Sequence, residues 1–322
     1  MATLKSKFSH LQSRDDTGFS SNASGRFVHK NGMPNVRRAG LSNPLQKYSW
    51  YHTMLDLPSW KFILLLISGY ILANLCFATI YYSIGIEHLT GIDESTPLSE
   101  FTDVFFFSAQ TFTTVGYGRI APVGFLASMV ATFEAFLGLL GFAIATGLFY
   151  GRFSRPQAFL KFSKIALIVP YEGSSALMFR MAPYKNNLLT DAQVILTCAI
   201  DDTDEHGELK SKFFTLKTVI SQINILSLNW TVVHKIDEYS PFFELTKENF
   251  ETMDVEVFVH LRAFDEVFCN TVVQRTSYSS HHQEIIFAQK FNKMYAPSKR
   301  QKTTVLNLDL IDSYTPYSPY SI

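Results

Sequence analysis

The sequence is short of cysteine and has no net charge. Its three cysteines in 322 residues, Cys76, Cys198 and Cys269, are scattered without a CxxC spacing. This argues against a disulfide framework or a cysteine metal centre, and it suits a reducing compartment. Lysine plus arginine number 28, as do aspartate plus glutamate, so the formal net charge is zero. A neutral chain has no overall attraction for nucleic acid, and we expect no such partner.

Several enzyme signatures are also missing. The sequence after Gly151 contains no GxSxG, HExxH, P-loop or paired-cysteine pattern, and no strand–GxGxxG–helix unit. We therefore expect a protein that is not an enzyme and that carries no cofactor.

Two long apolar stretches are present. The stretch from Trp60 to Tyr82 has one charge, Lys61, at its start, and the stretch from Pro122 to Tyr150 is interrupted only by Glu134. About 20 apolar residues in a helix cross a hydrocarbon core of about 30 Å. The sequence therefore predicts two membrane spans, at about residues 60–82 and 122–150.

The charges that flank these spans differ in sign between the two sides. Basic residues precede the first span and follow the second: Arg37, Arg38, Lys47 and Lys61, then Arg152, Arg155, Lys161 and Lys164. The connecting loop has five acidic residues and a single basic one, Arg119. Because positive residues favour the cytoplasmic side, we expect both termini to be cytoplasmic in a multi-pass protein of the cell membrane.

The segment before the first span has two parts. Residues 1–43 are polar and basic without an apolar run, which predicts a cytoplasmic N-terminal segment and no secretory signal. Residues 44–58 are amphipathic, with Leu45, Tyr48 and Leu55 on one face. A short helix on the membrane surface has this pattern. An ordinary soluble amphipathic helix is the alternative, which the adjacent span disfavours.

The amino-acid composition changes after the second span. Beyond a linker at residues 151–163, residues 164–322 contain short runs rich in Val, Ile, Phe and Thr, separated by turns. These runs are Ile165–Pro170, Ala176–Met181, Ala192–Ile200, Phe213–Val219, Trp230–Ile236, Val255–Leu261, Thr271–Tyr278 and Glu284–Ala288. Their spacing predicts a cytoplasmic β-sandwich, with one brief helix that Thr246 caps.

The loop between the spans predicts a short helix. Ser99 is a suitable N-cap for a helix over residues 99–112, whose first turn holds Glu100 and Asp103. This helix is too short to cross the bilayer, so it must re-enter and be buried in protein.

The five residues Thr114 to Gly118 read TVGYG. Backbone carbonyls and a threonine hydroxyl can replace the water shell of a potassium ion. Gly116 and Gly118 permit the dihedrals that this requires, while Val115 and Tyr117 point away and brace the strand. A chance Gly-Tyr-Gly turn is the alternative, which the preceding helix disfavours. One strand cannot encircle an ion, so we expect a homotetramer with potassium at the carbonyls.

With this filter, four more segments resemble the bacterial inward-rectifier potassium channels (KirBac family), from about Gly25 to about Tyr295. They are Gly25–Leu41, Gly147–Pro156, Asn229–Pro241 and Gln274–Tyr278. The resemblance implies a pore domain at residues 59–150, an immunoglobulin-like cytoplasmic sandwich, and voltage-independent, passive potassium conduction across the bacterial inner membrane. A two-span channel gated by a different cytoplasmic ligand, and a membrane-tethered enzyme, are the weaker alternatives.

The resemblance also implies residue roles. Gly138 and Gly141 lie where the inner helix can bend, and Tyr150 lies where a bulky side chain closes the inner bundle. Related channels bind anionic phospholipid near the cytoplasmic leaflet. The resemblance places five basic residues there: Arg37, Arg38, Arg152, Arg155 and Lys161. These residues can equally signal topology alone.

Three residues depart from the family pattern or stand out within it. Arg119, directly after the filter, would place a ring of positive charge at the outer mouth unless Glu94, Glu100 or Asp103 pairs with it. Phe142 stands where strongly rectifying members have an acid, which argues against strong rectification. Glu134 lies deep in a span, either as a buried partner of the pore helix or as a charge that lines the pore.

Overall fold

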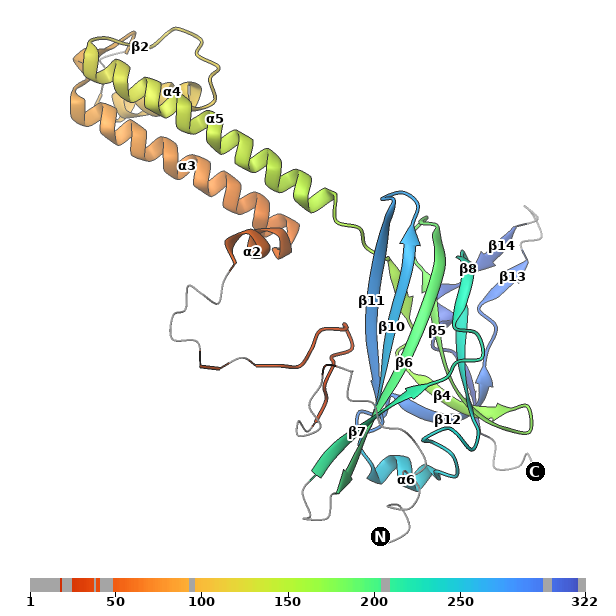
Figure 1. Cartoon of the computed structure of the whole chain (residues 1–322). Helices are drawn as coiled ribbons and strands as arrows, with labels where there is room; N and C mark the ends of the chain where they lie inside the picture. The colour runs from red at the N-terminus through yellow and green to blue at the C-terminus, as the bar shows by residue number, and fades with distance from the viewer. Residues whose placement is uncertain are drawn as a thin grey trace. The chain divides into compact units, whose positions relative to one another are not determined.

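The computed structural model describes residues 18, 25–37, 39–40, 49–92, 96–203, 209–297 and 303–317. The chain divides into two compact units, Ala39–Arg155 and a second one that joins Met1–Arg38 to Pro156–Ile322. We call them the membrane unit and the sandwich unit, and Figure 1 shows the elements of each.

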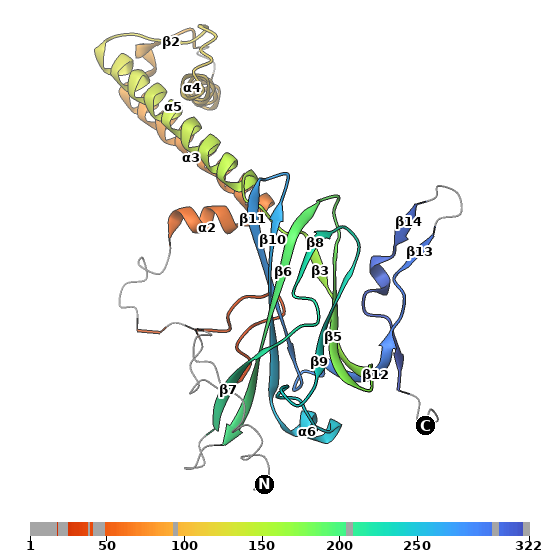
Figure 2. The same ribbon diagram turned by 45° about the vertical axis from the view of Figure 1, so that its right-hand side comes forward.

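The membrane unit contains two helices that are long and apolar enough to cross a membrane, α3 (Ser59–Ile84) and α5 (Phe125–Phe153). They run alongside each other in both views, with α4 (Pro97–Phe112) beside one end of the pair and α2 (Trp50–Asp56) near the other (Figures 1 and 2). Of the expected surface helix at 44–58, residues 44–48 lie outside the described part of the chain.

The second span begins later than predicted. Residues Ala121–Pro122 form the short strand β2, which pairs with β1 (Leu89–Thr90). Gly124, with φ of 85°, then turns the chain into α5. The predicted start at Pro122 was wrong because hydropathy does not distinguish an apolar strand residue from the first turn of a helix.

The short helix α4 also begins differently from the prediction. Its N-cap is Thr96, with Pro97 in the first turn, and the Thr96 hydroxyl accepts a hydrogen bond from the Ser99 amide at 3.3 Å. Glu100 lies in the first turn and Asp103 beyond it. The prediction of Ser99 as the cap was wrong, because it overlooked the preference of proline for the first helical position.

The sandwich unit consists of two packed sheets, which Figure 2 shows side by side. The first has the order β11–β10–β6–β7, with β8 also on β6, and the second has the order β15–β12–β4–β5–β3, with β9 also on β5. The strands are β3 (Leu160–Phe162), β4 (Ala166–Tyr171), β5 (Ser174–Pro183), β6 (Leu189–Thr203), β7 (Leu209–Leu216), β8 (Gln222–Leu226), β9 (Trp230–Ile236), β10 (Val255–Asp265), β11 (Asn270–Ser279), β12 (Ile285–Phe291) and β15 (Tyr314–Pro316). A separate pair, β13 (Tyr295–Pro297) and β14 (Thr304–Leu306), follows β12.

Each of the eight predicted runs overlaps a strand of this sandwich, although Phe213–Val219 extends beyond the end of β7 at Leu216. The prediction missed β3, β13, β14 and β15, which have three residues each, and β8, which has five. The side chains between the sheets are fully buried, among them Phe179, Leu196 and Tyr278. Burial of each such side chain contributes roughly 1.5–3 kcal/mol. The brief helix α6 (Lys247–Thr252) begins at Thr246 with a complete capping box, which confirms the prediction.

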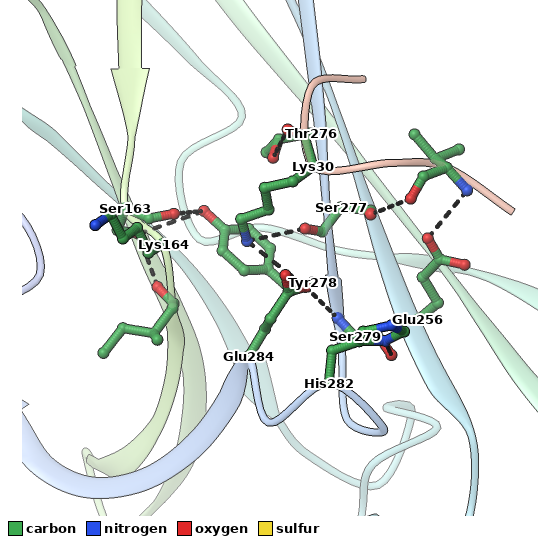
Figure 3. Close-up of polar contacts among 12 residues, drawn as sticks. Lys30, Ser163, Lys164, Glu256, Thr276, Ser277, Tyr278, Ser279, His282 and Glu284 are labelled. Atoms are coloured by element: carbon green, nitrogen blue, oxygen red, sulfur yellow. Dashed lines mark hydrogen bonds and ion pairs between the residues drawn. The ribbon is translucent and has the colours of Figure 1, made fainter. Parts of the chain in front are cut away.

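The N-terminal segment is anchored to the first sheet by side chains of β10 and β11. The Glu256 carboxylate accepts hydrogen bonds from the amides of Phe27 at 2.7 Å and Val28 at 3.2 Å. Ser277 donates to the Val28 carbonyl at 2.6 Å. Figure 3 shows Lys30 beside them, with its ammonium 3.0 Å from the Ser277 carbonyl and 3.7 Å from the centre of the Tyr278 ring.

The buried position of this anchor changes the pKa of two of its groups. Burial lowers the pKa of Lys30 to about 8, although the charge of Glu284 opposes the change. Burial raises the pKa of Glu256, and the amides of Phe27 and Val28 oppose this effect. Burial of the Glu256 carboxylate is costly, and the hydrogen bonds from the two amides offset part of that cost. The same hydrogen bonds hold the N-terminal segment on the sheet.

Candidate functional site

The segment after α4 folds back onto the last turns of that helix. The amide of Thr114 donates to the Thr111 carbonyl at 3.0 Å. The amides of Val115 and Gly116 both donate to the Gln110 carbonyl, at 2.9 and 3.3 Å. These bonds satisfy carbonyls that the end of a helix otherwise leaves without partners, and they fix the start of the TVGYG segment.

Alternate residues of this segment have left-handed backbone conformations. The φ angles are 59° at Thr114, 51° at Gly116 and 79° at Gly118. Alternation of this kind turns successive peptide groups toward the same side, as a carbonyl-lined ion path requires. The sequence indicated the two glycines but not Thr114, because a threonine rarely adopts a positive φ and carries no signal for it.

The side chains between these positions are open to solvent in the single chain. Val115 is 53% exposed and Tyr117 is 81% exposed. The bracing contacts expected of them thus need surfaces outside the chain's own described residues.

At the outer end of the segment, Arg119 pairs with an acidic side chain of α4. Its Nη2 lies 3.4 Å from Oδ2 of Asp103. Of the three acids proposed as partners, Glu94 lies outside the described residues. Gly91, which the sequence reasoning missed, allows the backbone of Arg119 to approach, since a Cβ there would lie 2.0 Å from the Arg119 carbonyl oxygen.

Behind the segment, Glu134 of α5 is completely buried. Its Oε1 lies 2.5 Å from the Ser108 hydroxyl of α4, and its Oε2 accepts from the Tyr81 hydroxyl of α3 at 2.7 Å. Ser108 in turn lies 3.2 Å from Oδ1 of Asn74. Of the two alternatives for Glu134, the structure therefore supports the buried partner of the pore helix.

One turn further along α5, Gly138 lies against the end of α4. A Cβ at Gly138 would lie 1.9 Å from the Phe112 carbonyl oxygen, and one at Gly141 would lie 3.6 Å from the Phe112 ring. Glycine at 138 is thus required by close packing. Bending at Gly138 and Gly141 stays a prediction, as does closure by Tyr150, whose side chain is 75% exposed.

Two of the basic residues assigned to lipid are engaged within the membrane unit. The Arg152 guanidinium donates to the carbonyls of Met54 at 2.8 Å, Leu55 at 3.1 Å and Leu57 at 2.7 Å. Arg155 Nη1 lies 2.5 Å from Oδ1 of Asp56. A cation at these carbonyls caps the C-terminal end of α2 and ties that helix to α5.

The other three candidates have different surroundings. Arg37 is exposed, and Arg38 lies outside the described residues. Lys161 was predicted in a linker at 151–163, but it lies in β3 of the sandwich unit, and its Nζ donates to the Leu308 carbonyl at 3.2 Å. Only residues 154–159 lie between α5 and β3. A three-residue strand is too short for sequence periodicity to detect.

Comparison with known proteins gives matches in both units. The family model "Inward rectifier potassium channel C-terminal domain" matches residues 160–316, and the model "Ion channel" matches residues 69–155. A solved DNA glycosylase structure from Pseudomonas fluorescens aligns with a TM-score of 0.18 and 12% identity over 57% of this chain and 48% of that chain, and it supports no conclusion.

Curated relatives extend the match over most of the chain. The inward rectifier potassium channel Kirbac3.1 of Paramagnetospirillum magnetotacticum is 35% identical over 271 residues, covering 83% of this chain and 88% of the relative. The inward rectifier potassium channel irk-1 of Caenorhabditis elegans is 26% identical, covering 90% of this chain and 57% of the relative. Inward rectifier potassium channel 18 of Homo sapiens is also 26% identical, over 86% of this chain and 68% of the relative. This chain therefore belongs to the inward-rectifier potassium channel family and is similar to its bacterial members, with two membrane helices and a β-rich C-terminal domain.

Proposed function

We propose that four copies of this chain form a passive, potassium-selective channel in which residues 114–118 are the filter. The observation that carries the proposal is the alternation of left-handed conformations at Thr114, Gly116 and Gly118. With the amides held by Gln110, this alternation supports a segment whose backbone carbonyls would replace the hydration shell of a cation.

The exposed side chains beside the filter support the tetramer. Tyr117 and Val115 are both exposed in one chain, at 81% and 53%. Four-fold symmetry would give these side chains partners and close a ring of carbonyls around one axis. We place this channel in the bacterial inner membrane with both termini in the cytoplasm, since the basic flanks favour that side.

Gating is proposed at the inner end of α5, with Gly138 and Gly141 as flexible positions and Tyr150 as the closing side chain. Because Arg152 binds three carbonyls at the end of α2, a displacement of α2 would be transmitted to α5 two residues beyond Tyr150. Anionic phospholipid is proposed as the modulator, through Arg37, Arg38, Arg155 and the neighbouring Arg152. Arg155 is 40% exposed, so a phosphate can compete with Asp56 for it.

Flux from purified protein in liposomes tests conduction. We expect uptake of potassium and rubidium, exclusion of sodium, and loss of flux in Gly116→Ala, because a Cβ opposes the φ of 51° at that position. The detergent-solubilised protein should have the mass of four chains. Equal permeability of wild type to sodium and potassium would refute the filter assignment, and a conducting monomer or dimer would refute the tetramer.

A dose series of phosphoinositide tests the lipid role. The resemblance to bacterial members implies inhibition of rubidium uptake. Arg155→Gln should weaken that inhibition. The control is Lys61→Gln, which removes a basic side chain in the first turn of α3 and should leave the inhibition unchanged. Identical dose responses in wild type, Arg155→Gln and the double variant with Arg152→Gln would show that the basic cluster acts on topology alone.

A further inference from the structure

Glu134 connects all three helices of the membrane unit at a single point. Its two carboxyl oxygens meet hydroxyl groups from α4 and α3, at 2.5 Å from Ser108 and 2.7 Å from Tyr81. Among the residues that the structure describes, no ion pair includes Glu134. In an apolar surrounding, a carboxyl group without hydrogen-bond partners is costly, so these hydroxyls account for its presence at this depth.

The contact between α5 and α4 spans two successive turns of each helix. Glu134 meets Ser108, and Gly138, one turn further, meets the Phe112 carbonyl at the end of α4. The first contact is polar and directional, and the second is a steric contact that leaves no room for a Cβ. Both contacts lie on the face of α4 toward α5, so together they oppose a rotation of α4 about its axis.

The turn of α4 between these contacts holds the filter. Gln110 lies between Ser108 and Phe112, and its carbonyl accepts the amides of Val115 and Gly116. A rotation of α4 that breaks the bond between Ser108 and Glu134 would move this carbonyl and the two filter amides with it.

We propose that Glu134 is a positioning residue for potassium selectivity, acting through Ser108 on the turn of α4 that holds the filter. This inference rests on the proposed function of residues 114–118 as the filter. In this proposal Glu134 does not line the pore. It helps to keep the carbonyl rings of the filter at the spacing that excludes sodium.

Hydrogen-bond accounting indicates which side chains can replace Glu134. A glutamine keeps one acceptor for the Tyr81 hydroxyl and gains a donor for the Ser108 oxygen. The Ser108 proton is then available to Oδ1 of Asn74, which lies 3.2 Å away. A leucine has a similar volume but gives neither hydroxyl a partner on α5. The Tyr81 hydroxyl then loses its acceptor, and Ser108 keeps only the oxygens of Asn74 on α3, so α4 loses its polar contact with α5.

The experiment compares sodium and rubidium uptake in liposomes for the wild type and for Glu134→Gln, Glu134→Leu, Ser108→Ala and Tyr81→Phe. We expect near-wild-type selectivity in Glu134→Gln and a loss of rubidium-over-sodium preference of about fivefold or more in Glu134→Leu and Ser108→Ala, as for one lost buried hydrogen bond. In the double variant of Glu134→Leu with Ser108→Ala, the loss should not exceed that of the more severe single variant. Thr79→Val is the matched control, because within the described part of the chain the Thr79 hydroxyl bonds only the Leu75 carbonyl of its own helix.

The outcomes separate this inference from the proposed function. If the wild type does not discriminate between the ions, the filter assignment fails first. If the wild type is selective and Ser108→Ala matches it, the positioning role of Glu134 through Ser108 is refuted, even where Glu134→Leu fails to assemble. Loss of selectivity in Glu134→Gln equal to that in Glu134→Leu would also refute it, since the glutamine network retains its bonds.

Discussion

Glu134 of the membrane unit and Glu256 of the sandwich unit are both buried, 0% and 4% exposed, and both connect segments distant in the sequence. Glu134 receives the hydroxyls of Ser108 and Tyr81, from α4 and α3. Glu256 receives two backbone amides of the N-terminal segment, with Arg26 at 4.0 Å. The comparison shows that a buried carboxyl group can fasten a helix by side-chain hydroxyls, or an irregular segment by its own amides.

The difference follows from the hydrogen-bond donors that each segment has available for the carboxyl group. The amides in the middle of a helix are already bonded within the helix, so α4 and α3 can present only side chains to Glu134. The segment around Phe27 has a single isolated bridge, Val28 to Pro34, and its amides are therefore available to a carboxylate. The predictions below test this difference, in order of decreasing effect.

Removal of the carboxylate should have the largest effect at Glu256. Glu256→Ala removes the carboxylate that accepts the amides of Phe27 and Val28, and we expect the N-terminal segment to lose about 2–4 kcal/mol of docking free energy. Amide hydrogen exchange of the assembled protein measures this as lost protection at residues 27 and 28. Glu256→Gln keeps one acceptor and should lose less, and unchanged protection in Glu256→Ala would contradict the anchor.

The steric half of the α4–α5 contact is tested by Gly138→Ala. The added Cβ would lie 1.9 Å from the Phe112 carbonyl oxygen, so the helices must separate, at a cost of roughly 1–3 kcal/mol. Thermal unfolding of the detergent-solubilised protein measures the loss. Gly147→Ala on the same helix is the control, because a Cβ there meets no described residue within 4 Å. Equal effects of both substitutions would attribute the loss to helix flexibility rather than to packing.

Loss of the positive charge of Arg26 should weaken the docking of the N-terminal segment by a smaller amount. Glu256 has this charge nearby, whereas no ion pair of Glu134 is found among the described residues. Arg26 bonds Glu284 at 3.1 Å and lies 4.0 Å from Glu256, and it is partly exposed. Arg26→Gln should cost about 1 kcal/mol of N-terminal docking, and salt should reduce that cost by screening. Hydrogen exchange of residues 27 and 28 at low and high salt provides the measurement, and a salt-independent loss would mean that Arg26 acts by packing.

The smallest expected effect is a pH dependence at Lys30. Its pKa in the folded protein is about 8 against 10.5 for the free side chain, so the unfolded chain binds more protons between these values. Stability therefore rises as pH increases through this window, by no more than about 1 kcal/mol once solvent screening of a partly exposed ammonium is allowed for. Lys30→Met should remove the rise in thermal stability between pH 7 and pH 10, and its persistence would assign it to another group.

The parts of the fold that depend on local pattern could be predicted from the sequence. The length and hydropathy of the two spans, the eight longer strands and the capping box at Thr246 all depend on neighbouring residues alone. The glycines of the filter belong to this class, since left-handed φ angles of 51° and 79° favour a residue without a side chain.

The partners of single side chains were beyond such reasoning. Arg152 and Lys161 look alike in sequence as basic residues after a span, yet one caps α2 and the other bonds Leu308 within the sandwich unit. Thr114 adopts a φ of 59° because Thr111 and Gln110 hold the amides around it. Glu134 faces α4 and α3 because Ser108 and Tyr81 lie there. The sequence by itself determined the elements and the filter motif, because hydrophobic period and backbone freedom act within a few residues. Only the tertiary structure decided what each buried polar group binds, because its partner must come from wherever the chain returns to the same place.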